Sequence, residues 1–143
     1  RRHFEIWAIQ RIPGIAPNEK GGADRGIDGR GRMVETPDGD YTKVVLAQVK
    51  SGKFSLSQLR DFLYVMHREN AAMGVYLTME DVASKEAQNE ILEFGRVTVG
   101  TDVFPRVRFY SMEEYFHGKH LAMPAMINPY TGKPLMRVLP FGF

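Results

Sequence analysis

An acidic, glycine-flanked turn followed by an apolar strand is the feature that most constrains this chain of 143 residues. The turn reads GADRGIDG from Gly22 to Gly29, and the strand reads KVVLAQVK from Lys43 to Lys50. Apolar and β-branched residues suit a buried strand. Because side chains alternate along a strand, Gln48 and Lys50 share one face and the valine between them takes the other. Two polar residues thus end an otherwise apolar strand.

A second extended segment, residues 26–35, precedes this strand, and the sequence TPDGD between them is a strong turn signal. A two-residue loop, DG, would place Asp28 opposite Val49, on the face without the polar side chains. A three-residue loop, PDG, would place Asp28 opposite Gln48, with Gly39 in the left-handed position common in such loops. We predict an odd-length loop or a bulge, which brings the carboxylate and the two polar residues into one polar concavity at the end of two adjacent strands.

These residue types suit metal-assisted chemistry on a phosphate. The carboxylate of Asp28, the amide oxygen of Gln48 and the backbone carbonyl of Val49 are oxygen ligands for a hard cation such as magnesium. Lys50 beside the metal can orient or deprotonate a water, or stabilise charge that develops on the phosphate. The alternative is a solvated hairpin with unrelated charges, which a lone Asp or Lys would favour. The whole constellation favours a functional site.

The turn and the strand together resemble the PD-(D/E)xK nuclease superfamily, and most closely its Mrr-like restriction endonuclease branch. In that branch an Asp lies in a D-x-G-I-D-G turn, which residues 24–29 match, and Q-x-K replaces E-x-K. The resemblance covers about residues 1–95. It implies hydrolysis of DNA phosphodiesters with magnesium, or manganese as the alternative. Asp28 would be the metal ligand, Gln48 the auxiliary ligand and Lys50 the catalytic lysine.

The first twelve residues, RRHFEIWAIQRI, predict an amphipathic helix whose apolar stripe contains Phe4, Trp7, Ala8 and Ile12. Glu5 lies beside that stripe. The resemblance gives Glu5 a role, because related nucleases often carry a Glu on the first helix that reaches the metal or its waters. A solvent-facing carboxylate is the alternative interpretation.

The remaining pattern predicts an α/β fold: a mixed central sheet of the restriction-endonuclease type with helices on both faces. No good strand is visible between the first helix and the acidic turn, so we expect a very short strand or a loop there. Ser55 is the expected N-cap of a helix over 56–71. A following strand over 73–79 should run parallel to a neighbour. Further elements are a helix over 83–94, strands over 97–99 and 106–110, and a short helix capped by Ser111.

Polar and basic residues around the turn and after the strand are candidate DNA contacts: Arg25, Arg30, Ser51, Lys53, Gln58 and Arg60. The net charge of +2 is too small to demonstrate nucleic-acid binding, although it permits it. Neither a recognition helix nor a basic arm is visible. We therefore expect a fused or associated methyltransferase, helicase or specificity domain, and a homodimer is compatible with the pattern.

Composition excludes several other classes. The chain contains no cysteine, which excludes disulfides and cysteine-based zinc sites and is typical of a protein of the reducing cytoplasm. None of the four His residues has a convincing zinc-ligand spacing, and no apolar run approaches the roughly 18 residues of a membrane span. The chain opens with Arg rather than Met, so we expect a domain cut from a longer protein. Residues 1–118 would form the nuclease domain, and residues 119–143 a Pro-rich apolar arm or a link to a neighbouring domain.

The expected function is a metal-dependent DNA endonuclease domain, part of a restriction-modification or DNA-defence enzyme. A junction-resolving or repair nuclease with the same site is the nearest alternative. A DNA-binding module that has lost catalysis is another, because the amide of Gln48 is a poorer ligand than a carboxylate. A structural interaction domain, in which the polar cluster is an accident, is the third.

Overall fold

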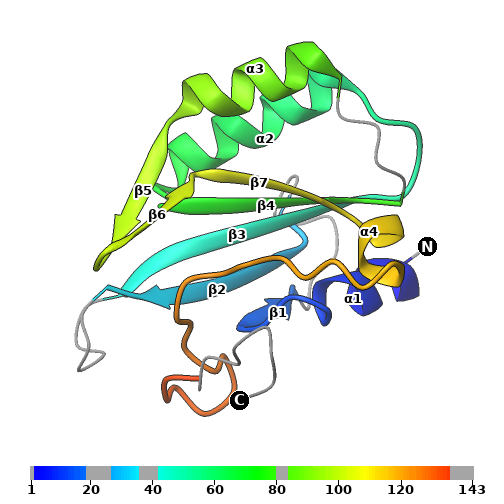
Figure 1. Ribbon diagram of the computed structural model, residues 1–143. Coiled ribbons are helices and arrows are strands. Elements are labelled where there is room, and N and C mark those ends of the chain that lie inside the picture. Colours follow the sequence, from blue (N-terminus) through cyan, green and yellow to red (C-terminus); the bar gives the residue numbers. More distant parts are fainter. Residues whose placement is uncertain (1, 19–26, 36–41, 80–83, 136–143) are drawn as a thin grey trace.

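A mixed sheet of five strands lies at the centre of the structure (Figure 1). The computed structural model describes residues 2–18, 27–35, 42–79 and 84–135. In spatial order the strands are β1 (Ile15–Pro17), β2 (Gly29–Val34), β3 (Thr42–Lys50), β4 (Met73–Thr78) and β7 (Val107–Ser111). β1, β2 and β3 pair antiparallel, whereas β3, β4 and β7 run parallel. The predicted parallel strand after the long helix is therefore confirmed.

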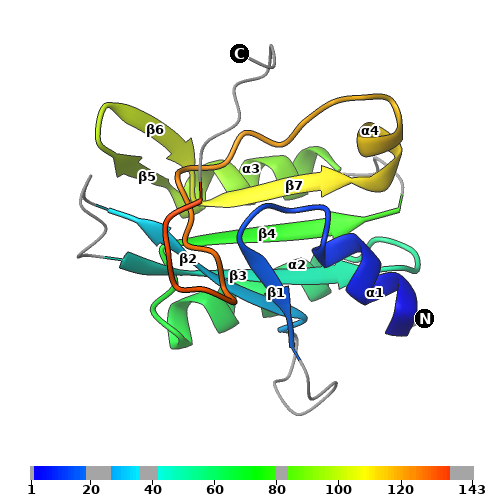
Figure 2. The same ribbon diagram turned by 90° about the horizontal axis from the view of Figure 1, so that it is seen from below.

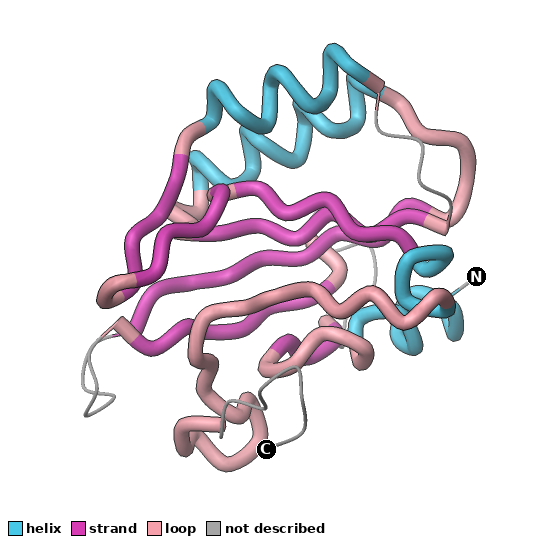
Figure 3. Tube along the Cα trace, viewed as in Figure 1, coloured by secondary structure: helices cyan, strands magenta, loops and turns pink. Residues whose placement is uncertain are grey.

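Helices cover both faces of this sheet, which confirms the predicted α/β class (Figures 1 and 3). On one face, here the α2 face, lie α2 (Leu56–Arg68) and α3 (Lys85–Phe94). On the other, the α1 face, lies α1 (Arg2–Ile9), while α4 (Met112–Phe116) follows β7. Figure 2 shows α1 in front of the sheet, with α2 and α3 behind it. A separate hairpin of β5 (Arg96–Val99) and β6 (Asp102–Pro105) joins α3 to β7, and β6 was not predicted.

The register between β2 and β3 is the one that a three-residue loop would give. Gly29 pairs with Ala47 and Val34 pairs with Thr42. The same register, continued by one residue before β2 begins, would bring Asp28 opposite Gln48. The loop itself, residues 36–41, lies outside the described residues.

Alternation along β3 divides its side chains between two cores. Val45, Ala47 and Val49 pack with Ala8 and Ile9 of α1 on the α1 face. Residues of the other parity face α2, where the buried side chains are Leu46, Leu59, Phe62, Met66 and Tyr76. β4 is buried along its whole length because helices cover it on both sides, as is usual for parallel strands.

The strand missing from the sequence pattern exists but is three residues long. β1 pairs with Gly29, Arg30 and Gly31 of β2. A Cβ at Gly31 would collide with the backbone carbonyl of Gly14, so only glycine permits this close approach of the two strands. A pattern of alternating side chains cannot be read in so short a segment, and this explains why the sequence left the strand undecided.

Serine caps three helices, two of them at the predicted residues Ser55 and Ser111. Ser55, Ser84 and Ser111 each accept a backbone N–H from the third helical residue. Only the last forms a complete capping box, with Glu114 bonding back. The pair Ser55 and Gln58 has the spacing of a capping box, but the box is incomplete, because the side-chain oxygen of Gln58 has no partner among the described residues.

The chain after α4 returns across the α1 face as far as it is described. Met123 and Met126 are buried in the core of that face. Backbone hydrogen bonds also tie this segment to β2, from Val34 N–H to the carbonyl of Ala125 and from Ile127 N–H to that of Arg32. Residues 119–135 thus dock on the sheet. Within the described ranges, we find no helix with the length and hydrophobicity needed to cross a membrane.

Candidate active site at the end of β2 and β3

The backbone of Asp28 lies where β1, β2 and β3 meet. Its carbonyl accepts the N–H of Asn18 at 2.9 Å, and its own N–H donates to the carbonyl of Ala47 at 2.9 Å. Gly29 then begins β2 directly opposite Ala47, whereas β3 continues to Lys50. Asp28 is therefore held at the edge where β3 runs on without β2 beside it.

The carboxylate of Asp28 occupies the position that a backbone carbonyl of β2 would otherwise take. Its Oδ2 accepts the N–H of Val49 at 2.8 Å. In an extended strand, the N–H and C=O of one residue point toward the same edge. The carbonyl of Val49 therefore also points to the side of β3 on which Asp28 lies.

Gln48 and Lys50 project from β3 on the α2 face, because they share the parity of the strand residues that pack against α2. Asp28 lies on the same side by alternation, because it precedes Gly29, which pairs with Ala47 of the α1 face. Arg30, two residues along β2, forms an ion pair with the C-terminal end of α2. The structure thus places the three residues singled out in the sequence on one face, at one end of two adjacent strands.

The side-chain oxygen of Gln48 has no hydrogen-bond partner among the described residues although it is buried. An unsatisfied buried acceptor costs about 1–3 kcal/mol, so native structures usually supply a partner. A cation or an ordered water beside Asp28 would supply one.

Sequence reasoning missed Tyr76, which is paired with Gln48 across β3 and β4 and is fully buried. Its ring stacks on Phe109, and its hydroxyl has no partner among the described residues. Burial, together with the negative charges of Asp28 and Asp61, raises the pKa of Tyr76 to about 12. The tyrosine and two carboxylates therefore lie near one another, and only the pairing of β3 with β4 reveals this.

Replacing Tyr76 with phenylalanine is expected to preserve or raise the free energy of unfolding at pH 7, because it removes a buried hydroxyl without a partner in the described part of the chain. Above pH 10 the free energy of unfolding of the variant should rise further relative to that of the wild type. In the wild type the unfolded phenol ionises at its ordinary pKa of 10.0, whereas the folded one keeps its proton to about 12. The stability that depends on the neutral phenol is complete below pH 10 and is lost as the pH rises toward 12.

Urea unfolding at neutral and alkaline pH measures this difference. Tyr110→Phe is the matched control, since the hydroxyl of Tyr110 donates to the carbonyl of Lys119. The free energy of unfolding of Tyr110→Phe should be about 1 kcal/mol lower than that of the wild type at pH 7, because this hydrogen bond is lost. If the free energy of unfolding falls equally in the wild type and in Tyr76→Phe between neutral and alkaline pH, the expectation is wrong.

Glu5 lies half-buried on α1, at the end of the sheet toward which β3, β4 and β7 run (Figure 1). It precedes the fully buried residues Ala8 and Ile9 by one helical turn, so it lies on the side of α1 that faces the sheet. The helix is shorter than the predicted residues 1–12 and ends at Ile9. Whether the Glu5 carboxylate reaches Asp28 stays a prediction.

The candidate DNA contacts have different surroundings. Arg25 lies outside the described residues. Arg30 forms an ion pair with Glu69 at 3.0 Å, and this hydrogen bond is the main cause that lowers the pKa of Glu69. Ser51 and Lys53 follow β3 in a loop, half-buried and exposed respectively.

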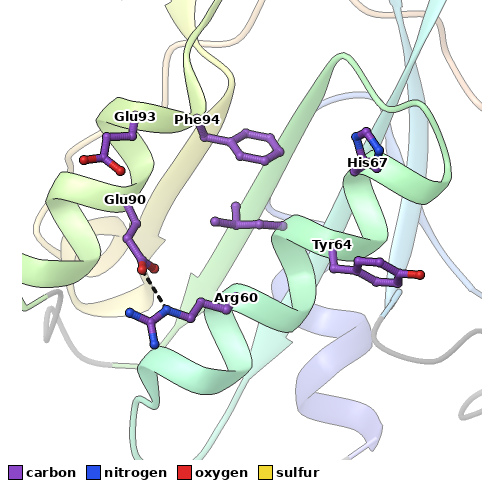
Figure 4. A pocket seen from close by; sticks show the side chains of 7 residues that line it. Arg60, Tyr64, His67, Glu90, Glu93 and Phe94 are labelled. Carbon is purple, nitrogen blue, oxygen red and sulfur yellow. Dashed lines mark hydrogen bonds and ion pairs between the residues drawn. The ribbon is translucent and has the colours of Figure 1, made fainter.

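The two candidates on α2 also differ from each other. Gln58 lies in the first turn with its side-chain oxygen buried and without a partner among the described residues. Arg60 instead reaches across to α3, where its Nε contacts Glu90 at 2.7 Å (Figure 4). That ion pair lines a pocket between the two helices, walled by Tyr64 and Phe94. This pairing weakens the case for Arg60 as a phosphate contact.

The donor set at the end of β2 and β3 fits a hard, oxygen-preferring cation. It consists of a carboxylate, a buried amide oxygen that lacks a partner in the described part of the chain, and a backbone carbonyl. Within the described ranges there is no group of three His, Cys, Asp or Glu side chains that could hold a metal. The fit therefore depends on the amide and the backbone oxygen as well as on Asp28.

A comparison with known protein families identifies a family for most of this chain. The family model described as restriction endonuclease matches residues 14–101, more than half of the chain, from just before β1 to just after β5. No significant similarity was found among curated proteins or among solved structures. The matched segment contains Asp28, Gln48 and Lys50, whereas α1 with Glu5 precedes it. With its restriction-endonuclease-like α/β fold, the chain belongs to the Mrr-like restriction endonuclease family of the PD-(D/E)xK superfamily.

Proposed function

We propose that this nuclease domain is a magnesium-dependent endonuclease that hydrolyses DNA phosphodiester bonds. The observation that carries the proposal is the hydrogen bond between the Asp28 carboxylate and Val49 N–H, which holds that carboxylate at the end of β3. Gln48 lies on the same face as Asp28 with a buried, unpartnered oxygen in the described structure, and Lys50 follows two residues later on that face.

Asp28, the side-chain oxygen of Gln48 and the carbonyl of Val49 would hold the metal. When bound, Mg²⁺ supplies a Lewis acid for a phosphate oxygen and lowers the pKa of a bound water. Mn²⁺ favours the same oxygen ligands and is the natural substitute. The buried surroundings strengthen these electrostatic interactions relative to bulk water.

Lys50 would act at the attacking water or at the developing phosphate charge. Hydrolysis forms one bond between the water oxygen and phosphorus and breaks the bond from phosphorus to a sugar oxygen, which leaves with a proton. An ammonium group beside the phosphate stabilises the charge that grows as these bonds change. Glu5, on the sheet-facing side of α1, would orient water at the metal.

The DNA would approach from the end of the sheet where β3 ends, with Ser51, Lys53 and Gln58 as phosphate contacts. Nothing in the described surface reads base edges, so recognition would fall to a methyltransferase, helicase or specificity domain of a restriction-modification or DNA-defence enzyme. Cleavage of branched DNA in preference to linear duplex would instead favour a junction-resolving or repair role.

One observation supports a second candidate, a DNA-binding module without catalysis. Gln48 occupies the position of the second carboxylate in E-x-K sites, and a neutral amide contributes less to the binding of a divalent cation. The two candidates differ in cleavage but not in DNA binding.

The test is incubation of the full-length protein with plasmid DNA, methylated and unmethylated, with Mg²⁺, with Mn²⁺ and with a chelator. We expect nicked or linear product only when metal is present. If the full-length protein binds the plasmid but leaves it intact with either metal, the silent module is the correct reading. A failure to bind DNA at all would contradict both.

A further inference from the structure

A second polar groove lies at the opposite end of the sheet from the candidate active site. It is formed where β3 and β4 begin, beside the turn after α2 and the start of β5. Its volume of about 490 Å³ is within the range of roughly 300–1,000 Å³ typical of ligand pockets. Four of the ten residues that line it are basic and none is acidic: Arg32, Lys43, Arg96 and Arg106.

Three of these cations have no carboxylate partner among the described residues. Lys43 is the exception, since it pairs with Glu35 at 3.2 Å. Arg96 is exposed at the start of β5, and Arg32 is exposed on β2. Among the described residues, the groove therefore carries about three positive charges without a carboxylate partner.

Two of the guanidinium groups are already held in place. Arg106 donates to the carbonyls of Ala71 at 2.9 Å and Ala72 at 3.4 Å, and it lies over the ring of Phe94 at 4.6 Å. Arg32 donates from Nη1 to the hydroxyl of Thr42 at 3.0 Å. A guanidinium has five N–H donors, so donors remain for an anion after these bonds are formed. Fixed donors lose little entropy when an anion binds.

The groove lies on the same face of the sheet as Asp28. Arg32 pairs with Val44, and both share the parity of the residues that face α2. Arg30 and Arg32 therefore lie on one face of β2, and Asp28 lies just before that strand. At about 3.3 Å per residue, Arg32 is about 13 Å from Asp28, which corresponds to about four base pairs of duplex DNA. This separation is within the length of one short duplex that passes outside α2 and contacts both places.

We propose that this groove is a second phosphate-binding site, which holds the DNA backbone several base pairs from the bond that is cut. This inference rests on the proposed function, because it assigns a role to the same DNA. It explains why a mildly charged chain gathers, at the end of the sheet remote from Lys50, three arginines that have no carboxylate partner in the described part of the chain. The Arg30–Glu69 pair between the two sites is internally compensated, so the attraction for phosphate is concentrated at the two ends.

The test compares Arg32→Gln, Arg96→Gln and the double variant with Lys133→Gln, which removes one exposed charge outside the groove. Arg106 is left unchanged because it also bonds to the turn after α2. Fluorescence anisotropy with a labelled duplex, without divalent metal, gives the affinity at several salt concentrations. Each phosphate contact contributes about 0.9 to the slope of log affinity against log salt. We expect the slope to fall by about 0.9 for each arginine and by about 1.8 for the double variant, with no change for Lys133→Gln.

Cleavage separates this inference from the proposed function. At saturating DNA with Mg²⁺, the arginine variants should cut at the wild-type rate, because the groove is remote from Lys50. If the arginine variants have the same salt slope as Lys133→Gln, the groove does not bind phosphate. This conclusion holds whether or not the wild type cuts DNA. Conversely, a wild-type protein that never cuts would contradict the proposed function and leave the metal-free slopes as an independent result.

Discussion

Replacing Lys50 with alanine is expected to abolish most DNA cleavage while DNA affinity falls only modestly. Lys50 lies on the same face as Asp28 and Gln48, at the end of β3. A general-base or electrostatic contribution of this kind is worth about 10² to 10⁴ in rate. Most of the affinity comes from many phosphate contacts, of which Lys50 is at most one. The measurement is cleavage rate and binding affinity on the same DNA at fixed salt.

Lys53→Ala is the matched control. Lys53 is exposed three residues further along, in the loop after β3, and the variant removes the same charge. We expect it to weaken binding to a similar extent as Lys50→Ala and to cut at close to the wild-type rate once DNA is saturating. Wild-type-like cleavage by Lys50→Ala would remove Lys50 from the mechanism.

Asp28→Asn should stop cleavage as completely as Asp28→Ala but leave the fold closer to that of the wild type. The carboxylate has two separable roles, as a metal ligand and as the acceptor of Val49 N–H. Asparagine keeps an oxygen for the N–H and loses the charge, whereas alanine loses both. Alanine should therefore cost about 1–3 kcal/mol of stability through the unsatisfied N–H, and asparagine much less.

Two measurements check this prediction. Thermal or urea unfolding separates the two variants, and titration with Mn²⁺ followed by electron paramagnetic resonance tests metal binding without any cleavage. Both variants should lose Mn²⁺ binding, and DNA binding should stay the same or tighten because a negative charge near phosphate is gone. Metal binding retained by Asp28→Asn would contradict the role of Asp28 as a ligand.

The structure also shows how a single strand can serve the fold and the chemistry. β3 presents apolar side chains to α1 on one face, and on the other it changes from Leu46, in the core under α2, to Gln48 and Lys50. The change coincides with the point where β2 begins, so the polar residues lie where β3 extends beyond β2 and the Asp28 carboxylate bonds to it instead. A site built on paired strands is more rigid than one built on loops.

The sequence alone determined the features that depend on local periodicity. The shared parity of Gln48 and Lys50, the parallel β4 and the serine caps follow from side-chain alternation and helix-end chemistry, and the structure agrees with them. The register of β2 against β3, which places Asp28 next to the end of β3, followed from counting residues across one turn, because the register of a hairpin is set by its loop length. These relations join residues that are close in the chain or separated by one loop.

Only the tertiary structure decided which distant residues meet. Tyr76 reaches the site because β4 pairs with β3, and Arg60 is paired with Glu90 because α3 packs beside α2. The groove gathers basic residues from β2, β3, β5 and the segment before β7, and no periodicity within one element could indicate it. Such contacts depend on the sum of packing energies over the whole sheet, which is the reason that a reading of single segments does not reveal them.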